Sequence, residues 1–472
     1  ADAQAAIEEG GVAPAGAVVL RAEPYIPIGH VGARPRDLTR EELRAWARGQ
    51  GTALTPVVAD DGAALRDLLG VAELPAAAVV MPDWAACAEH VATHAGTWAL
   101  VPWDAVSQRV QPMRVEGHVP EARALTDYPL QRRIWLLARA PLPPDLVAAL
   151  QGALCYAPPP SVELVAVGDV MLGRSVGDAM RATSPRYPFE GVGVQALLSG
   201  ADLAFGNLEC AISDRGQRQV KAYTFRAAPS AALRLTFAGL DVLALANNHS
   251  MDYGPLALAD TVAHLREAGL VPVGAGANTS EAYAPQIVER NGLRLAFLAY
   301  NEVGPRWMDA AEARPGSAYL DPARLAADVR AARAQADLVI VSCHWGIESR
   351  FEATAGQQRV ARSLEEAGAA LVIGHHPHVV QGLAHGRTAL AVYSLGNFVF
   401  DMGLPNTSEG VALRCTLDPT GVKTFALLPY AIRRGQPALL GSTEGAPILA
   451  RIARLTALQG GLPQPQAASP AR

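Results

Sequence analysis

The sequence predicts an α/β protein in which a smaller N-terminal α/β domain precedes a larger one. Half of the 472 residues are hydrophobic, which is enough for more than one core. Three consecutive prolines lie in the segment 156–161 and favour an extended linker. After this linker, short apolar runs alternate with helical segments, as in an α/β sheet that is covered on both faces.

Residues 1–155 are predicted to form the smaller α/β domain. A helix should begin after Thr39, because Glu42 completes a capping box with it, and Gly49 can end this helix. Residues 76–81 suggest a short buried strand, and a second helix is expected over residues 83–94. The histidines of this domain are isolated from one another, so we expect no catalytic group here.

The larger domain is predicted to cover residues 162–440. Its apolar runs are expected to be strands, with helices over residues 256–268 and 322–336. Two apolar runs flank Asn291-Gly292, a strong hairpin signal, so the sheets should be mixed rather than purely parallel. The tail 459–472 is rich in Gly, Pro and Gln and is predicted to be disordered.

The composition argues against several classes of protein. The formal net charge of −5 argues against nucleic acid as a partner, because binding to phosphates requires a basic face. No apolar run reaches the roughly 18 residues of a membrane helix. The cysteines are scattered and form no CxxC pair, so a disulfide scaffold is not expected. They are Cys87, Cys155, Cys210, Cys343 and Cys415.

Five predicted strands each end in a carboxylate, an amide or an imidazole. Sites of α/β proteins form at the carboxyl ends of strands, so we expect these side chains to converge. Imidazole and carboxylate together suit Zn, Mn or Fe, and the number of donors suits two ions about 3.5–4 Å apart. The residues, in chain order, are Asp169, Asn207, Glu209, Asn248, His249, His344, His376 and His378.

Each of these motifs also has a purely structural interpretation. Asp169 could belong to a turn, Asn248 could follow a strand that simply ends, and His344 could be a core histidine. The pair His376 and His378 is harder to explain in this way, because residues two apart on an extended segment point to the same side. The prediction of a metal site therefore rests on the joint placement of all of them.

These motifs, taken in order, resemble the CapA family of capsule or poly-γ-glutamate synthesis proteins, a branch of the calcineurin-like metallophosphoesterases. The resemblance covers about residues 162–402 and implies a four-layer α/β/β/α sandwich. It implies the metal ligands Asp169, Glu209, Asn248, His344, His376 and His378. The motifs are "VGDVMLGR", "FGNLE", "ALANNHSMDYG", "CHWGIE", "GHHPHVVQG" and "YSLGNFVFD".

Two positions depart from the pattern of the superfamily. Met171 stands where an Asp-x-His motif would place its histidine, so one metal position would lose an imidazole. Glu209 stands near the place of a bridging aspartate and is one carbon longer. One or two divalent ions, Mn, Fe or Zn, are therefore expected.

Catalytic roles are expected for His249, Asp169 and Arg174. A divalent ion can lower the pKa of a coordinated water toward 7, and His249 could then protonate the leaving group. Arg174 could clamp an anionic substrate or could be an ordinary surface arginine. Further substrate contacts are expected from Glu348, Asn397 and Asn207, whereas Asp252 and Tyr253 are expected to fix the loop that carries His249.

The resemblance implies a metal-dependent hydrolase that acts on an anionic polymer, such as poly-γ-glutamate, or on a phosphoester. The alternative is a non-catalytic factor that binds or exports the polymer. The N-terminal segments "LTREELRAWARGQG" and "YPLQRRIWLLAR" resemble pieces of periplasmic substrate-binding proteins and suggest a ligand-sensing module.

The resemblance also implies an extracytoplasmic location at the cell surface, near membrane-associated synthesis machinery, through an N-terminal segment absent from this chain. The first residues, "ADAQAAIEEGG", would suit a mature start after an Ala-rich cleavage site.

Overall fold

The computed structural model of the chain separates into two compact units, of which the first runs to Pro159 and the second begins at Pro160. The structure describes residues 5–10, 18–31, 36–60, 62–138, 143–154, 156–184 and 186–459. The tail predicted to be disordered lies, apart from its first residue, outside these residues. Among the described residues, none of the helices has the length and hydropathy needed to cross a bilayer.

The first unit contains a sheet with the strand order β1-β9-β2-β6-β4-β5, and β7 pairs with β2. Its strands are β1 (Ala5–Gly10), β2 (Val18–His30), β4 (Thr55–Ala59), β5 (Val79–Met81), β6 (Thr97–Pro102), β7 (Val110–Pro112) and β9 (Gln131–Ala138). Two short strands, β3 (Asp37–Leu38) and β8 (Arg114–Val115), pair with each other. The helices are α1 (Arg40–Ala47), α2 (Ala63–Leu69), α3 (Trp84–Thr93) and α4 (Pro144–Leu154).

The local predictions for this unit have mixed outcomes. Helix α1 begins as expected, because the Thr39 hydroxyl accepts from the Glu42 N–H at 3.1 Å and the Glu42 carboxylate accepts from the Thr39 N–H at 2.8 Å. Helix α3 also lies where it was predicted. The prediction of a buried strand at residues 76–81 is wrong: β5 is a three-residue strand at the sheet edge, and Val80 is 62% exposed.

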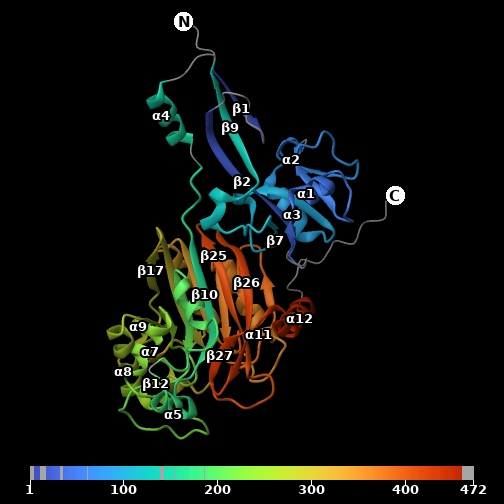
Figure 1. Ribbon diagram of the computed structural model, residues 1–472. Coiled ribbons are helices and arrows are strands. Elements are labelled where there is room, and N and C mark those ends of the chain that lie inside the picture. Colours follow the sequence, from blue (N-terminus) through green and yellow to red (C-terminus); the bar gives the residue numbers. More distant parts are fainter. Residues whose placement is uncertain are drawn as a thin grey trace. The chain divides into compact units, whose positions relative to one another are not determined.

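The second unit is built on two mixed sheets, and Figure 1 labels β10, β25, β26 and β27 of the first and β17 of the second. The first sheet has the order β15-β14-β11-β10-β25-β26-β27, and β24 also pairs with β10. Its strands are β10 (Val162–Val170), β11 (Leu203–Leu208), β14 (Val242–Ala244), β15 (Val271–Val273), β24 (Asn397–Val399), β25 (Glu409–Asp418), β26 (Gly421–Arg433) and β27 (Gln436–Leu439).

The second sheet has the order β17-β18-β20-β21-β23-β22. Its strands are β17 (Gln286–Arg290), β18 (Leu293–Asn301), β20 (Leu338–His344), β21 (Leu371–His375), β22 (Leu383–His385) and β23 (Leu390–Val392). The helices of this unit are α5 (Arg174–Ala182), α6 (Val194–Gly200), α7 (Ala231–Ala238), α8 (Gly254–Glu267), α9 (Thr279–Ala282), α10 (Pro322–Arg333), α11 (Ala355–Ala367) and α12 (Ser442–Leu458).

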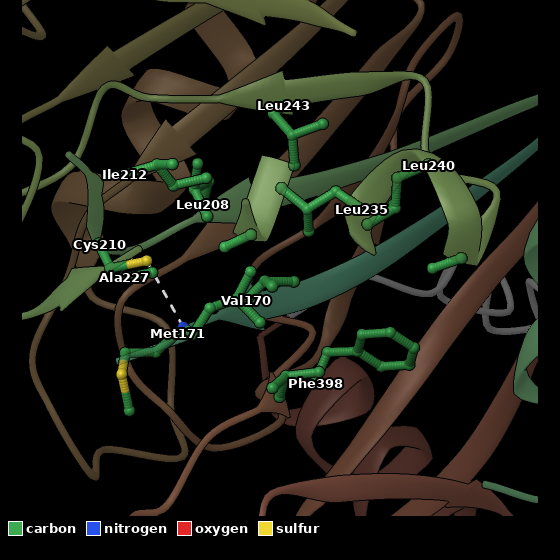
Figure 2. Close-up of a cluster of buried hydrophobic side chains, with 14 of the residues drawn as sticks. Val170, Met171, Leu208, Cys210, Ile212, Ala227, Leu235, Leu240, Leu243 and Phe398 are labelled. Atoms are coloured by element: carbon green, nitrogen blue, oxygen red, sulfur yellow. Dashed lines mark hydrogen bonds between the residues drawn. The ribbon is translucent and has the colours of Figure 1, made fainter. Parts of the chain in front are cut away.

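The alternation of side chains along the strands separates three cores and so defines four layers. On β10, Leu164 belongs to the core between the two sheets, whereas Val165 belongs to the core beneath α5 to α8. On β18, Leu295 belongs to the core between the sheets, whereas Ala296 packs in the core beneath α10 and α11. Figure 2 shows the core beneath α5 to α8, where Leu235 lies among strand residues. The predicted α/β/β/α sandwich is therefore confirmed.

Two further features bear on the predictions. Asn291 and Gly292 both have positive φ, at 49° and 80°, and join the antiparallel strands β17 and β18 as the hairpin signal predicted. No element was predicted for residues 441–458, where α12 places Ile448 and Ile452 in the core between the sheets. This helix was not predicted because Gly445 and Pro447, in its first turns, are residues that usually interrupt helices.

Gly168 is expected to be essential for the position of β24 beside β10, because a Cβ atom there would overlap the carbonyl oxygen of Gly396. We expect Gly168→Ala to lower the free energy of unfolding by about 1–3 kcal/mol or more. Thermal unfolding of the whole chain measures this effect. Gly200→Ala is the control, since Gly200 has open space around it and ends a helix. Equal melting temperatures of the two variants would contradict the prediction.

Candidate metal centre

The ends of strands from both sheets meet at one place. Within the first sheet, Asp169 on β10 pairs in register with Asn207 on β11 and with Asn397 on β24. Within the second sheet, His344 on β20 pairs in register with His375 on β21. The two sheets are connected here because His375 Nδ1 lies 3.1 Å from Asp169 Oδ1. The predicted convergence of strand ends is therefore present.

The first group of possible metal ligands consists of Asp169, Glu209 and His344. Their ligand atoms all lie within 4.8 Å of one another, and the three residues are buried. Asn248 belongs to the same place, because its Oδ1 lies 2.9 Å from His344 Nε2. This group therefore offers two carboxylates, an amide oxygen and an imidazole.

The second group consists of Glu348, His376 and His378, whose ligand atoms also lie within 4.8 Å of one another. Glu209 lies between the two groups, since its Oε1 is 3.7 Å from His378 Nε2. All six residues predicted as metal ligands are thus brought together, and Glu209 is positioned to bridge two ions.

The backbone of His376 and His378 differs from the expectation. We expected an extended segment, but β21 ends at His375, and His376 and His378 have φ of 94° and 59°. A left-handed backbone is uncommon for residues other than glycine. The rings are nevertheless close, with centroids 5.9 Å apart, so a turn rather than a strand brings them to the same site.

The pKa values of the two buried carboxyl groups are shifted in opposite directions. Burial alone would raise the pKa of Asp169, but hydrogen bonds from His375 and His378 hold it well below its usual range. Burial raises the pKa of Glu209 well above its usual range, and the neighbouring Asp169 carboxylate adds to this effect. Without a cation the site therefore favours an ionised Asp169 beside a protonated Glu209, and a divalent ion would favour the ionised form of both.

The three histidines are also distinct. Burial lowers the pKa of His344 well below its usual range and that of His376 to about 3, so both are neutral, as metal ligands must be. Burial would also lower the pKa of His378, but the Glu209 and Asp169 carboxylates raise it to about 9.

Buried polar atoms without a hydrogen-bond partner converge on the site. They include Glu209 Oε1 and His376 Nδ1. Buried polar atoms are normally paired, and an uncompensated buried charge is strongly destabilising. A divalent cation would satisfy both atoms, and the donor set of nitrogen and oxygen suits Mn, Fe or Zn.

Asn207 and Asn397 hold site residues in place. Both are buried; Asn207 Nδ2 donates to Asp169 Oδ1 at 2.9 Å, and Asn397 Oδ1 accepts from His378 Nδ1 at 2.8 Å. Both side chains therefore orient residues of the site, and their expected contact with substrate stays a prediction. Two residues of the site were not predicted: His375, and also Asn247, whose Nδ2 donates to Asn207 Oδ1 at 3.1 Å. The only sequence signal for either was adjacency to predicted ligands.

His249 is fixed beside the metal ligands by Asp252. Its Nδ1 lies 2.7 Å from Asp252 Oδ2, and its ring stacks on Phe225 with centroids 4.0 Å apart. The bond to Asp252 orients Nε2 toward Glu209, at 3.8 Å from its Oε1. Burial lowers the pKa of His249 although Asp252 opposes this effect. Lys221, which carried no sequence signal, pairs with Asp252 at 2.7 Å.

Arg174, Tyr253 and Met171 lie around this centre rather than in it. The Arg174 guanidinium lies 3.3 Å from Asp401 and over the Phe225 ring at 5.4 Å, and its side chain is 43% exposed. The Tyr253 ring packs against a guanidinium, that of Arg226. Met171 belongs to the apolar core shown in Figure 2, so this position supplies no ligand, as the sequence predicted.

Comparison with known proteins identifies the family. Residues 163–402 match the sequence profile of the family described as bacterial capsule synthesis protein PGA_cap, and these residues are half of the chain. The chain belongs to this family. The matched residues contain all the members of both candidate ligand groups.

Two proteins named CapA and one solved structure are similar to this chain. The capsule biosynthesis protein CapA of Bacillus anthracis is 33% identical over 57% of this chain and 67% of that protein. The PGA biosynthesis protein CapA of Bacillus subtilis (strain 168) is 30% identical over 58% of this chain and 72% of that protein. The calcineurin-like phosphoesterase YfkN of Bacillus subtilis is 13% identical, with a TM-score of 0.35, over 64% of this chain and 99% of that chain.

Metal content is the direct test of this centre. Protein purified without chelator or a His tag is expected to carry about two equivalents of Mn, Fe or Zn, measured by plasma mass spectrometry. Asp169→Ala and His376→Ala should lose most of this metal, because each removes a buried ligand. His264→Ala, a substitution on α8 outside both ligand groups, should retain it. Unchanged metal content in the first two variants would rule out the assigned centre.

Asp252 is expected to be essential for the stability of the loop that carries His249. Its carboxylate pairs with Lys221 and His249 and accepts the Phe225 N–H at 2.6 Å. Asp252→Ala removes the acceptor of the buried Phe225 N–H and of His249 Nδ1 and leaves Lys221 with the Asn248 carbonyl, so we expect a loss of about 3–5 kcal/mol in urea unfolding. The exposed Asp214 provides the control, whose Ala variant should change stability by less than about 0.5 kcal/mol. A similar small change for Asp252→Ala would contradict this role.

Proposed function

We propose that this protein is a metal-dependent hydrolase of capsule or poly-γ-glutamate biosynthesis, acting on an anionic polymer or a phosphoester. One observation carries the proposal: six predicted ligands and His249 surround one place, where buried atoms of Glu209 and His376 lack hydrogen-bond partners. A site that only stabilised the fold would pair these atoms within the protein.

The chemistry follows from the positions of the residues. A divalent ion bound here would polarise the scissile group and lower the pKa of water toward neutrality. Asp169 and Glu209 supply the negative charge that holds cations, and Asn248 supplies a neutral oxygen. Because the Asp252 carboxylate holds His249 Nδ1, Nε2 carries a proton for the leaving group only in the imidazolium form, which Asp252 stabilises against the effect of burial.

A pocket next to the centre offers room for the substrate beyond the scissile bond. Its volume is about 490 Å³, and Phe400, which lines it, lies 5.1 Å from the His378 ring between ring centroids. Ser175, Thr183 and Arg434 also line it, together with Asp401, whose carboxylate accepts the Ser175 hydroxyl at 2.6 Å. Arg174 contacts Asp401, a residue that lines this pocket, at 3.3 Å. The guanidinium groups of Arg174 and Arg434 suit the carboxylates of a polyanion.

The relatives support the biological setting of the proposal. Two of them are named for capsule biosynthesis and PGA biosynthesis. We therefore propose that this protein acts outside the cytoplasm, at the cell surface, with membrane-associated synthesis machinery as a partner. The net charge of −5 favours such a setting over nucleic-acid binding.

His249 provides the test of the hydrolase. We expect the Mn-loaded protein to cleave poly-γ-glutamate or bis-p-nitrophenyl phosphate, and His249→Ala to lower kcat by roughly 10²–10⁴-fold because the leaving group loses its acid. Chromatography of the polymer and release of nitrophenol measure the two activities. His264→Ala should keep full activity, and metal content should stay unchanged in both variants.

Failure of the fully loaded wild-type protein to cleave either substrate would contradict the hydrolase. Binding of poly-γ-glutamate, measured by calorimetry on the same protein, would then favour the alternative of a polymer-binding or export factor.

A further inference from the structure

We propose that Glu348 is a metal ligand and that it supplies the donor which Met171 fails to supply. This inference rests on the proposed metal centre and adds to it a residue outside the expected ligand set. Its consequence is that the second group is a complete three-donor position, made of Glu348, His376 and His378, rather than a weakened one.

Met171 is not available to the site. Its side chain is fully buried in the core beneath α5 to α8, and its sulfur accepts the Gly173 N–H at 3.1 Å. Its own N–H donates to the Val399 carbonyl at 2.8 Å, which fixes this part of the chain against β24. The end of β10 therefore contributes only Asp169 to the centre.

Glu348 lies where a further ligand is needed. It follows β20 in the loop after His344, and its carboxylate is within 4.8 Å of the ligand atoms of His376 and His378. Ligands 2.0–2.2 Å from one ion lie roughly 3–4 Å from each other, so small rotations of the side chains would complete the position.

The loop that carries Glu348 is fastened to the segment that carries the two histidines. The Ser349 N–H donates to the carbonyl of Pro377, the residue between the histidines, at 2.8 Å. Gln381 Nε2 donates to the Arg350 carbonyl at 2.8 Å. These hydrogen bonds on the residues that follow Glu348 fix its backbone relative to His376 and His378, so the proximity is built into the fold.

The carboxylate and one of the imidazoles at this position each have atoms that are available to bind a metal ion. In the part of the chain that the structure describes, the Glu348 carboxylate has no hydrogen bond or ion pair, whereas neighbouring Glu302 accepts the Gly346 N–H at 2.8 Å. His376 is 4% exposed, and its Nδ1 is buried without a partner. An exposed carboxylate opposite two buried imidazoles leaves the solvent side of the position open to substrate.

The experiment compares Glu348→Gln with Glu352→Gln in the full chain. Glu352 is an exposed glutamate of the same loop, so its variant has the same change in charge. Manganese is titrated into chelator-treated protein by calorimetry, and plasma mass spectrometry then gives the bound equivalents. We expect two equivalents for the wild type and Glu352→Gln. In Glu348→Gln, one equivalent should bind at least about 10-fold more weakly or be lost, because a carboxylate ligand is removed.

The outcomes separate this inference from the proposed function. Two equivalents with unchanged affinity in Glu348→Gln would overturn the ligand assignment, even if turnover fell, and would make Glu348 a substrate contact instead. Wild-type protein that binds no manganese would overturn the ligand and the metal centre together. Loss of one equivalent in Glu348→Gln, from a wild type that cleaves neither substrate, would support the ligand and reject only the hydrolase.

Discussion

The buried carboxylate of Asp169 is the group on which the arrangement of the second unit depends. It accepts hydrogen bonds from Asn207 in its own sheet and from His375 in the opposite sheet. A buried carboxylate is tolerated only when such partners are present, because its desolvation is otherwise very unfavourable. One oxygen of this carboxylate, Oδ1, therefore joins the two sheets, whereas Oδ2 is buried without a hydrogen-bond partner and is available to a cation. A change in the relative position of the two sheets would consequently also change the geometry of the candidate metal centre.

Much of the site could be predicted because it depends on a local rule. Polar residues that directly follow buried strands must lie at the carboxyl ends of those strands. The sequence alone was therefore enough to single out Asp169, Glu209, Asn248 and His344. The four-layer sandwich itself came from the resemblance, and the alternation of residues such as Leu164 and Val165 between two cores then demonstrated it.

The remainder depends on distances between strands that are remote in sequence. His375 contacts Asp169 only because β21 and β10 end at the same place, and no pattern within "GHHPHV" distinguishes this histidine from its neighbours. Polarity alone also does not show that Asn207 bonds to Asp169 or that Asn397 bonds to His378, because each contact joins segments that are remote in sequence. Lys221 lies in a loop without periodicity, so its pairing with Asp252 carried no signal.

The left-handed backbone at His376 and His378 lowers the stability of the protein. Each such residue costs on the order of 1–3 kcal/mol, a cost that glycine would avoid. A glycine at either position would therefore relieve backbone strain, but it would remove an imidazole from the candidate metal centre. The turn at residues 376–378 is therefore less stable than a glycine-containing turn would be. Variants selected for stability without a functional screen should carry substitutions at these histidines.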